Sequence, residues 1–296
     1  MKKLLILSGK GGTGKTTTSA AFIRFSQAKA FADCDVDAPN LHLVEALEGE
    51  PKRYVYAGSE KAHIDPRQCI GCSQCMMVCR FNAIRMNADG NKCEINEYAC
   101  EGCGVCAYSC PMKAISMEED IAGEQEVYTG ERTFSTATLK MGRGNSGKLV
   151  SAVKLALYKH APETELAIID GSPGIGCPVI SSISGVDQVL VVAEPSLSGL
   201  SDLERIVRTA ASFEASTAVC VNKWDVSPEK TEAIEAFCRE NGVPFVGRIP
   251  FDREASRAIN DGRSLADVDC PASRALRQVY RSVMELMGLP EYAERV

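Results

Sequence analysis

The sequence predicts an α/β protein in which a mostly parallel sheet, covered by helices on both faces, is interrupted by a smaller α+β domain. Short apolar runs alternate with helical patterns along most of the 296-residue chain, as they do in parallel sheets. A glycine-rich loop joins the first apolar run to the first helix, and two cysteine-rich runs interrupt the alternation. We therefore expect a larger domain in two parts, residues 1–60 and 119–296, with an inserted domain at residues 61–118.

The elements of the larger domain follow from hydrophobic periodicity and from turn residues. Residues 3–7 form a continuous apolar strand, and the loop after them leads into a helix at 15–28. No glycine marks a turn before the second strand at Ala30–Asp33, and residues 40–47 are expected to be helical. Further strands are expected at 166–169, 188–193, 218–221 and 245–246, and further helices at 147–159, 199–212, 228–241, 253–260 and 272–287. Residues 129–147 contain glycine and serine and are expected to be a mobile connection.

Composition and charge argue against several classes of function. Hydrophobic residues make up 45% of the chain, which is enough for a sizeable core. The 33 basic and 39 acidic residues give a net charge of −6, which argues against broad nucleic-acid binding. No stretch approaches the roughly 20 apolar residues that span a bilayer, and the opening apolar run ends at Ser8, which favours a buried strand over a signal peptide. We expect a cytoplasmic protein, in which clustered cysteines favour metal over disulfides.

The glycine-rich loop has the spacing of a phosphate-binding loop. Residues 9–16 read Gly-Lys-Gly-Gly-Thr-Gly-Lys-Thr, and glycines let backbone N–H groups approach phosphate oxygens closely. Lys15 would supply a cation to the β- and γ-phosphates, and Thr16 would offer its hydroxyl to Mg²⁺. The residues expected to bind the nucleotide phosphates are Gly11, Gly12, Thr13, Gly14, Lys15, Thr16 and Thr17.

A second lysine in this loop, Lys10, gives the sequence a specific resemblance. Its position resembles the deviant Walker A motif of the MinD/ParA/Mrp superfamily of SIMIBI-type P-loop NTPases, which includes the nitrogenase iron protein. In that superfamily the extra lysine reaches across an ATP-sandwiched homodimer to the partner's nucleotide. The resemblance therefore implies an ATP-dependent homodimer with Lys10 and Lys15 as catalytic residues. The alternative for Lys10 is a solvated loop lysine.

Later motifs follow in the order of the same superfamily. Residues 33–37 (Asp-Cys-Asp-Val-Asp) resemble switch I, in which Asp35 aligns best with the aspartate that orients the attacking water. Asp33 and Asp37 have a second interpretation, as loop residues that cap a helix or surround Mg²⁺. Residues 168–174 resemble Walker B and switch II, so that Asp170 would hold Mg²⁺ and the Gly174 N–H would sense the γ-phosphate. The residues expected on the base side are Asn222, Pro250 and Asp252. The resemblance implies a Mg²⁺-dependent ATPase.

The two cysteine runs have the Cys-x2-Cys-x2-Cys-x3-Cys spacing with which bacterial ferredoxins hold [4Fe–4S] clusters. They begin 31 residues apart, at Cys69 and Cys100, and form an approximate internal repeat. In two-cluster ferredoxins the fourth cysteine of each run serves the other cluster. The resemblance thus assigns cluster 1 to Cys69, Cys72, Cys75 and Cys110, and cluster 2 to Cys100, Cys103, Cys106 and Cys79. Zinc would require separated Cys-x2-Cys pairs.

Six cysteines lie outside these ligand sets. Cys93 stands between the runs, and packing is its expected role, with replacement ligation as the alternative. Buried cysteines behave as small hydrophobes, which is the expectation for Cys34, Cys177, Cys220, Cys238 and Cys270. Cys177 has an alternative in metal binding at an interface, because its distance from Asp170 resembles that of a cluster ligand in the nitrogenase iron protein. The helix at 272–287 resembles the membrane-binding helix of MinD, but packing on the sheet is the expected role.

The motifs together predict an ATP-hydrolysing iron–sulfur protein with Mg²⁺, ATP and two [4Fe–4S] clusters as cofactors. It would couple nucleotide state to electron transfer, or to iron–sulfur or metal-cofactor maturation, through a redox or maturation partner. An alternative is a regulatory positioning ATPase of the MinD/ParA kind, whose clusters sense redox state or are structural. A third hypothesis is ferredoxin-type electron transfer beside a decayed ATPase. We expect no nucleic-acid partner and no membrane span.

Overall fold

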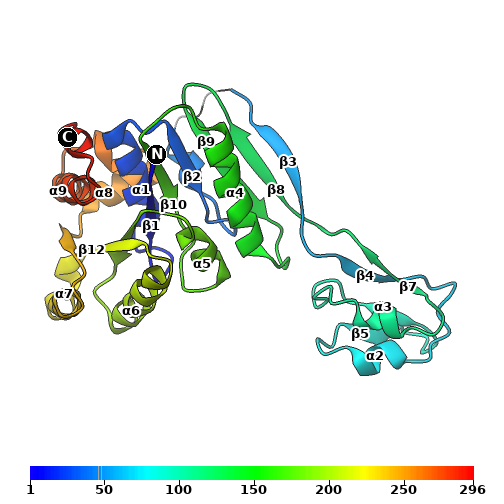
Figure 1. The fold of residues 1–296 in the computed structure, drawn as a ribbon. Helices are drawn as coiled ribbons and strands as arrows, with labels where there is room; N and C mark the ends of the chain where they lie inside the picture. The colour runs from blue at the N-terminus through cyan, green and yellow to red at the C-terminus, as the bar shows by residue number, and fades with distance from the viewer. Residues whose placement is uncertain (46, 48) are drawn as a thin grey trace. The chain divides into compact units, whose positions relative to one another are not determined.

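The computed structural model describes residues 1–45, 47 and 49–296, and the chain forms two compact units (Figure 1). Unit 1 comprises Met1–Arg53, Gln125–Thr138 and Ser146–Val296. Unit 2 comprises Tyr54–Glu124 and Leu139–Asn145, and the expected insert at 61–118 falls inside it.

A sheet of nine strands among the described residues forms the frame of unit 1, in the order β13-β12-β11-β1-β10-β2-β9-β8-β3. The central strand β1 pairs in parallel with β10 and β11, and β2, β9, β12 and β13 also join in parallel. Strands β3 and β8 run from one unit into the other. The strands are β1 (Lys2–Leu7), β2 (Ala30–Asp33), β3 (Lys52–Ala57), β8 (Ile121–Tyr128), β9 (Thr133–Leu139), β10 (Leu166–Asp170), β11 (Gln188–Ala193), β12 (Ser216–Asn222) and β13 (Phe245–Ile249). The predicted α/β class with a mostly parallel sheet is confirmed.

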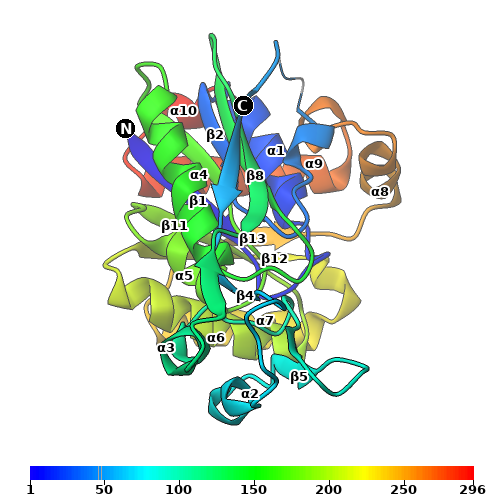
Figure 2. The same cartoon turned by 90° about the vertical axis from the view of Figure 1, so that its right-hand side faces the viewer.

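Helices cover both faces of this sheet. Helices α1 and α9 lie on one face, and α4, α5 and α6 lie on the other (Figures 1 and 2). The helices of unit 1 are α1 (Lys15–Ser26), α4 (Ser146–His160), α5 (Cys177–Ile183), α6 (Leu197–Ser212), α7 (Pro228–Glu240), α8 (Arg253–Asn260), α9 (Pro271–Leu286) and α10 (Pro290–Ala293). The described residues of unit 1 also contain the 3₁₀ turns η1 (Leu41–Leu43), η2 (Trp224–Val226) and η3 (Leu265–Asp267).

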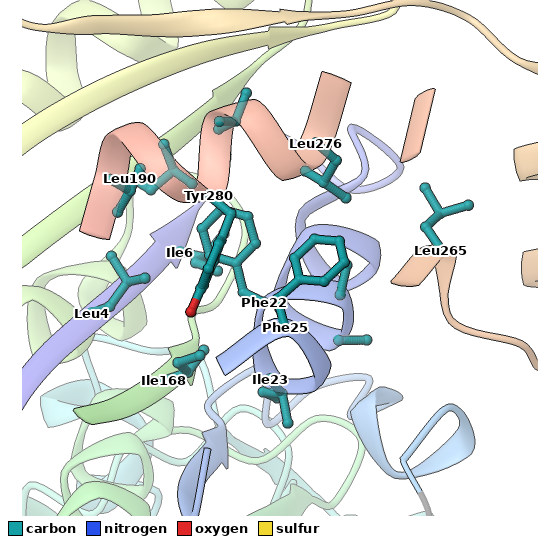
Figure 3. Packing of buried hydrophobic residues seen from close by; sticks show 14 of the residues in the cluster. Leu4, Ile6, Phe22, Ile23, Phe25, Ile168, Leu190, Leu265, Leu276 and Tyr280 are labelled. Carbon is teal, nitrogen blue, oxygen red and sulfur yellow. The ribbon is translucent and has the colours of Figure 1, made fainter. Parts of the chain in front are cut away.

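The apolar core on the α1 side fixes the helix that follows the phosphate-binding loop. Alternate residues of β1, Leu4 and Ile6, point into this core because side chains alternate across a strand (Figure 3). The fully buried Tyr280 of α9 meets Phe22 and Phe25 of α1 edge-on, with ring centroids 5.0 and 5.5 Å apart. Such aromatic pairs contribute about 0.5–1.5 kcal/mol each beyond the area that they bury. The expectation that the terminal helix packs on the sheet is therefore confirmed.

Three segments of the chain differ from what the sequence predicts. Residues 129–147 are not a mobile connection, because β9 lies within them, pairs with β2 and stacks Phe134 on Phe31 at 5.1 Å. Residues 40–47 do not form a helix over their described part, where only the single turn η1 is present, and Ala46 lies outside the described residues. Helix α1 ends two residues earlier than expected, since Gln27 adopts a left-handed φ of 52° and turns the chain without a glycine.

Unit 2 contains two similar halves. Its elements are β4 (Lys61–Ile64), α2 (Gln74–Val78), β5 (Ile84–Met86), β6 (Cys93–Ile95), α3 (Val105–Ser109) and β7 (Ile115–Glu118). Strand β4 pairs with β7 and β5 pairs with β6, both in antiparallel fashion. Helices α2 and α3 begin and end 31 residues apart, which is the spacing of the two cysteine runs. The internal repeat seen in the sequence is therefore a structural repeat.

Candidate nucleotide site and cysteine pockets

The ends of three adjacent parallel strands build the first candidate site, which lies in unit 1. The phosphate-binding loop follows β1, while Asp170 and Asp33 are the last residues of β10 and β2. Ligands of open α/β sheets bind at the carboxyl ends of the strands, and particularly where the chain order reverses. Here β1 lies between β10 and β11, so the loop stands at such a reversal.

Lys15 is buried among carboxylates. Its Nζ lies 2.8 Å from Asp170 Oδ1 and 3.9 Å from Asp35 Oδ2, and its side chain is 5% exposed. Burial disfavours the ammonium, but the charge and hydrogen bond of Asp170, with the charges of Asp33 and Asp35, outweigh it and raise the pKa of Lys15. Lys15 therefore stays protonated and carries a positive charge at the N-terminal end of α1.

Asp170 joins the loop to the sheet. Its side chain is fully buried and accepts hydrogen bonds from Thr16 Oγ1 and Ser19 Oγ, each at 2.7 Å. The two residues expected to hold Mg²⁺, Thr16 and Asp170, are thus in direct contact. Ser19 was not predicted from the sequence, although it lies one helical turn beyond Lys15, which places both side chains on the same face of α1.

Asp33 organises the loop after β2. Its carboxylate is buried and accepts backbone N–H groups of Asp35, Asn40 and Leu41, each at 2.9 Å. Burial and the nearby charge of Asp170 raise the pKa of Asp33 to about 7, against the lowering by the Leu41 N–H and Lys15. Burial also raises the pKa of Asp35. The bond from the Leu41 N–H places Asp33 at the start of the 3₁₀ turn η1, which agrees with its interpretation as a capping residue, and Asp37 is exposed.

A cleft of 630 Å³ opens beside these residues. Its size lies in the usual range of about 300–1,000 Å³ for small-molecule sites. The predicted site residues that line it are Lys10, Gly11, Gly12, Gly14, Lys15, Thr16, Thr17, Asp35, Asn222, Pro250 and Asp252. Thr13, Asp170 and Gly174 are not among its lining residues.

The residues expected on the base side have partners within the protein. Asn222 Nδ2 donates to the Thr13 carbonyl at 2.7 Å, and a Cβ on Gly14 would meet this amide at 2.4 Å, so Asn222 supports the loop. Asp252 caps α8 by accepting the Glu254 N–H at 2.8 Å. These contacts give Asn222 and Asp252 structural roles, while contact with a nucleotide base stays a prediction.

The two groups expected to reach the terminal phosphate are also hydrogen bonded to the protein. Lys10 Nζ donates to Ser198 Oγ and lies 4.0 Å from Glu194 Oε2, with 42% of its side chain exposed. The Gly174 N–H donates to the Ser8 carbonyl at 3.0 Å, at a φ of 95° that favours glycine. Both groups would have to exchange partners to reach a phosphate.

Cysteines line two small pockets in unit 2. The first cysteine pocket is lined by Cys69, Cys72, Cys75 and Cys110, together with Cys93. The second cysteine pocket is lined by Cys79, Cys100, Cys103 and Cys106. In each pocket three cysteines come from one run and the fourth from the other, which is the crossed arrangement that the resemblance to two-cluster ferredoxins implies.

The described residues contain no group of three or more His, Cys, Asp or Glu side chains placed to hold a single metal ion. This finding bears on mononuclear sites, whereas the four cysteines of a [4Fe–4S] cluster bind four different irons and surround the cube. The four expected cysteines of each pocket match the number of ligands that such a cluster takes. Outside these pockets, Cys34, Cys220, Cys238 and Cys270 are buried as expected, but Cys177 is exposed at the start of α5, contrary to the expectation of burial.

Comparison with known proteins identifies a family model and relatives that cover nearly all or part of the chain. A model of the CobQ/CobB/MinD/ParA nucleotide binding domain matches residues 4–265. The uncharacterized protein MJ0578 of Methanocaldococcus jannaschii is 32% identical over 294 residues, which cover 96% of this chain and 97% of the relative. An iron-sulfur cluster carrier protein of Methanococcus maripaludis is 29% identical over 136 residues, or 42% of this chain and 47% of that protein.

A solved structure shows the same fold. The septum site-determining protein MinD of Pyrococcus horikoshii OT3, complexed with Mg-ADP, matches 98% of this chain and 98% of its own with a TM-score of 0.57 at 16% identity. Within the part of the chain that the structure describes, no helix is both long enough and apolar enough to cross a membrane.

Proposed function

Because the chain belongs to the CobQ/CobB/MinD/ParA nucleotide-binding family of P-loop ATPases, we propose that it hydrolyses ATP and couples this reaction to a pair of [4Fe–4S] clusters in unit 2. The clusters would serve electron transfer, or the maturation of iron–sulfur or other metal cofactors, in partnership with another protein. The observation that carries the proposal is the pair of cysteine pockets, each with four cysteines drawn from both runs. The partial similarity to an iron-sulfur cluster carrier protein also favours it.

The residues of unit 1 fit an ATPase in which positioning and charge stabilisation perform the catalysis. Lys15 presents a permanent charge to the β- and γ-phosphates, and the loop glycines present backbone N–H groups. Thr16, which lines the cleft, and Asp170, which accepts a hydrogen bond from the Thr16 hydroxyl, would hold Mg²⁺. Asp35 lines the cleft beside Lys15 and would orient the attacking water.

Lys10 would act in an ATP-dependent homodimer. With 42% of its side chain exposed, it is accessible to a second copy of the chain, and its contacts with Ser198 and Glu194 are of the weak surface kind. The Asp35→Asn variant, blocked in hydrolysis, should therefore form a dimer with ATP but not with ADP in light scattering. A Lys10→Ala change in that variant should weaken the dimer, and equal dimerisation would contradict this role.

The ligand assignment is tested by counting iron. Anaerobically prepared protein should contain about eight irons and eight sulfides per chain, with the absorption of [4Fe–4S] clusters. Cys75→Ser should lose the cluster of the first cysteine pocket and about half of the iron. Cys238→Ser, which replaces a buried cysteine of α7, is the matched control and should keep all of it. Wild-type protein without iron would refute the proposal.

Coupling is tested by the dependence of ATP turnover on redox state. In the proposed function, turnover should differ between oxidised and reduced clusters, and electrons should reach an acceptor only during turnover. The fold likeness to MinD supports a second candidate, a positioning ATPase with structural or redox-sensing clusters. Turnover that ignores redox state, without electron delivery, would favour that candidate. Lys15→Ala should abolish function in both, and retained function would point to ferredoxin-type transfer alone.

A further inference from the structure

A cavity of unit 1 apart from the nucleotide cleft gathers arginines, in a chain whose net charge is −6. Its volume of 450 Å³ lies in the usual range of about 300–1,000 Å³ for small-molecule sites. Helix α1 begins at the nucleotide cleft and ends at this cavity, and its 12 residues place the two ends about 18 Å apart. The cavity, here called the arginine pocket, is lined by the side chains of Arg24, Arg132, Arg277 and Arg295.

Contacts within the protein hold these guanidinium groups in place. Arg132, Arg277 and Arg295 each donate a hydrogen bond to a backbone carbonyl, at distances between 2.6 and 3.3 Å. Arg277 also lies over the ring of Phe25, 4.5 Å from its centroid. An arginine has five N–H donors in a rigid fork, and these contacts use one or two of them. The remaining donors are therefore already positioned for a ligand.

Carboxylates offset only part of the positive charge among the described residues of the pocket. The buried Glu45 lies 3.4 Å from Arg24 Nε and 2.8 Å from Arg132 Nη2, so that one carboxylate serves two guanidinium groups. Asp267 also lines the pocket and is exposed. The main-chain oxygen of Val296 accepts a hydrogen bond from an arginine outside the pocket. Two positive charges remain in excess, and like charges around one cavity repel each other.

Capping of α1 explains only part of this arrangement. The last carbonyls of a helix attract cations, and Arg295 Nη1 donates to the carbonyl of Ser26, the last residue of α1, at 2.6 Å. Arg277 Nη2 donates instead to the carbonyl of Ala266, which belongs to η3, at 2.7 Å. Capping one helix does not require four arginines from four segments of the chain. A bound anion would relieve their mutual repulsion.

We propose that the arginine pocket binds a small molecule that carries a phosphate group. Arginine forks match phosphate oxygens, and a phosphate group has a charge of about −1.5 to −2 at pH 7, which balances the excess. A single carboxylate would offset only half of it. The volume of the pocket leaves room for the organic part of the ligand beside the buried Ile23 and Phe25, which also line it. The site shares no described lining residue with the nucleotide cleft or the cysteine pockets.

Calorimetric titration with glucose 6-phosphate tests the site in full-length protein saturated with Mg-ADP, so that the nucleotide cleft is not available to the probe. One molecule should bind per chain, whereas glucose should not bind. Arg277→Met and Arg295→Met each remove one fork and should weaken binding by about 10- to 100-fold. Arg274→Met is the matched control and should keep the wild-type affinity. Arg274 lies on the same helix α9, outside the pocket, and pairs with the exposed Asp269 at 2.6 Å.

Three results would overturn the inference. The first is wild-type protein that does not bind glucose 6-phosphate at millimolar concentrations. The second is equal affinity in the three arginine variants, which would place the binding elsewhere. The third is equally tight binding of malate, which carries two negative charges on carboxylates and would show that the pocket does not select phosphate. If Arg277→Met does not fold in urea titrations, Arg295→Met decides alone, because Arg295 is exposed.

Discussion

Replacing Lys15 with methionine should destabilise unit 1 even before a nucleotide is added. Lys15 Nζ lies 2.8 Å from a fully buried Asp170 oxygen, and at an effective dielectric constant of about 20 Coulomb's law gives this pair about 6 kcal/mol of attraction. The desolvation of the lysine offsets part of this attraction. Removing one partner of a buried ion pair then costs about 3–5 kcal/mol, because the other charge stays buried without compensation.

Urea unfolding in nucleotide-free buffer measures this effect. The chain has a single tryptophan, Trp224, which lies in unit 1 and reports the unfolding of that unit by fluorescence. Lys10→Met is the matched control, because Lys10 lies in the same loop but is 42% exposed, and exposed ion pairs contribute about 0–1 kcal/mol. In an Asp170→Asn background Lys15→Met should lower the free energy of unfolding by less, because the buried charge of Asp170 is absent. The reasoning would be refuted if the free energy of unfolding of Lys15→Met lay within about 1 kcal/mol of the wild-type value. It would also be refuted if Lys15→Met lowered that free energy equally in the wild-type and Asp170→Asn backgrounds.

Three further predictions follow from buried polar groups. Ser19→Ala removes a 2.7 Å hydrogen bond to Asp170, and it should lower the free energy of unfolding by about 1–3 kcal/mol and weaken Mg-ADP binding in calorimetry. Lys154→Met leaves three carbonyls at the end of α5 without their donor, and it should lower the free energy of unfolding in urea by at least about 3 kcal/mol. Lys148 is exposed on the same helix, so the control Lys148→Met should lower it by less than about 0.5 kcal/mol. Asp33 has a pKa raised from 3.8 to about 7, so the folded protein binds the extra proton in this window and its stability should fall as the pH rises from 4 to 7. Asp33→Asn should flatten that slope in urea unfolding measured at each pH, and an unchanged slope would contradict the assignment.

Local sequence patterns were sufficient to predict β1, the glycine-rich loop and α1 of unit 1. Strand β1, the glycine-rich loop and α1 are contiguous in the chain, so one short window carries an apolar run, the loop glycines and a helical pattern. Asp170 was found in the same way, at the end of the apolar strand β10. These residues meet because parallel strands end at one edge of the sheet, which a local pattern combined with the fold class can predict.

The parts that the sequence did not reveal depend on contacts between distant residues. Four of the seven residues of β9 are threonine or serine, yet nearly all of its side chains are buried. This polar composition is not typical of a buried strand, so the strand beside β2 was not predicted. A lysine in a helix is usually a solvent-exposed residue, but Lys154 Nζ donates to the carbonyls of residues 181, 182 and 184. Only the packing of α4 on α5 brings these carbonyls near. Such roles arise from tertiary neighbours and leave no periodic signal.

The hydrogen bonds of Lys10 and Gly174 suggest how a nucleotide would bias unit 1. Lys10 is held by the exposed Ser198 and by the half-buried Glu194, and contacts of this kind near the surface contribute about 0–1 kcal/mol. The Gly174 N–H is held by one neutral carbonyl, worth about 0.5–1.5 kcal/mol net, whereas a hydrogen bond to a charged oxygen contributes about 1.5–3 kcal/mol. If both groups reach a γ-phosphate, as the proposed function requires, that phosphate would offer each a stronger hydrogen-bond partner than its present one. Because ADP lacks that phosphate, the difference between the two nucleotides would act on the segments after β1 and β10. A ligand can shift a conformational equilibrium only by such a difference in interaction.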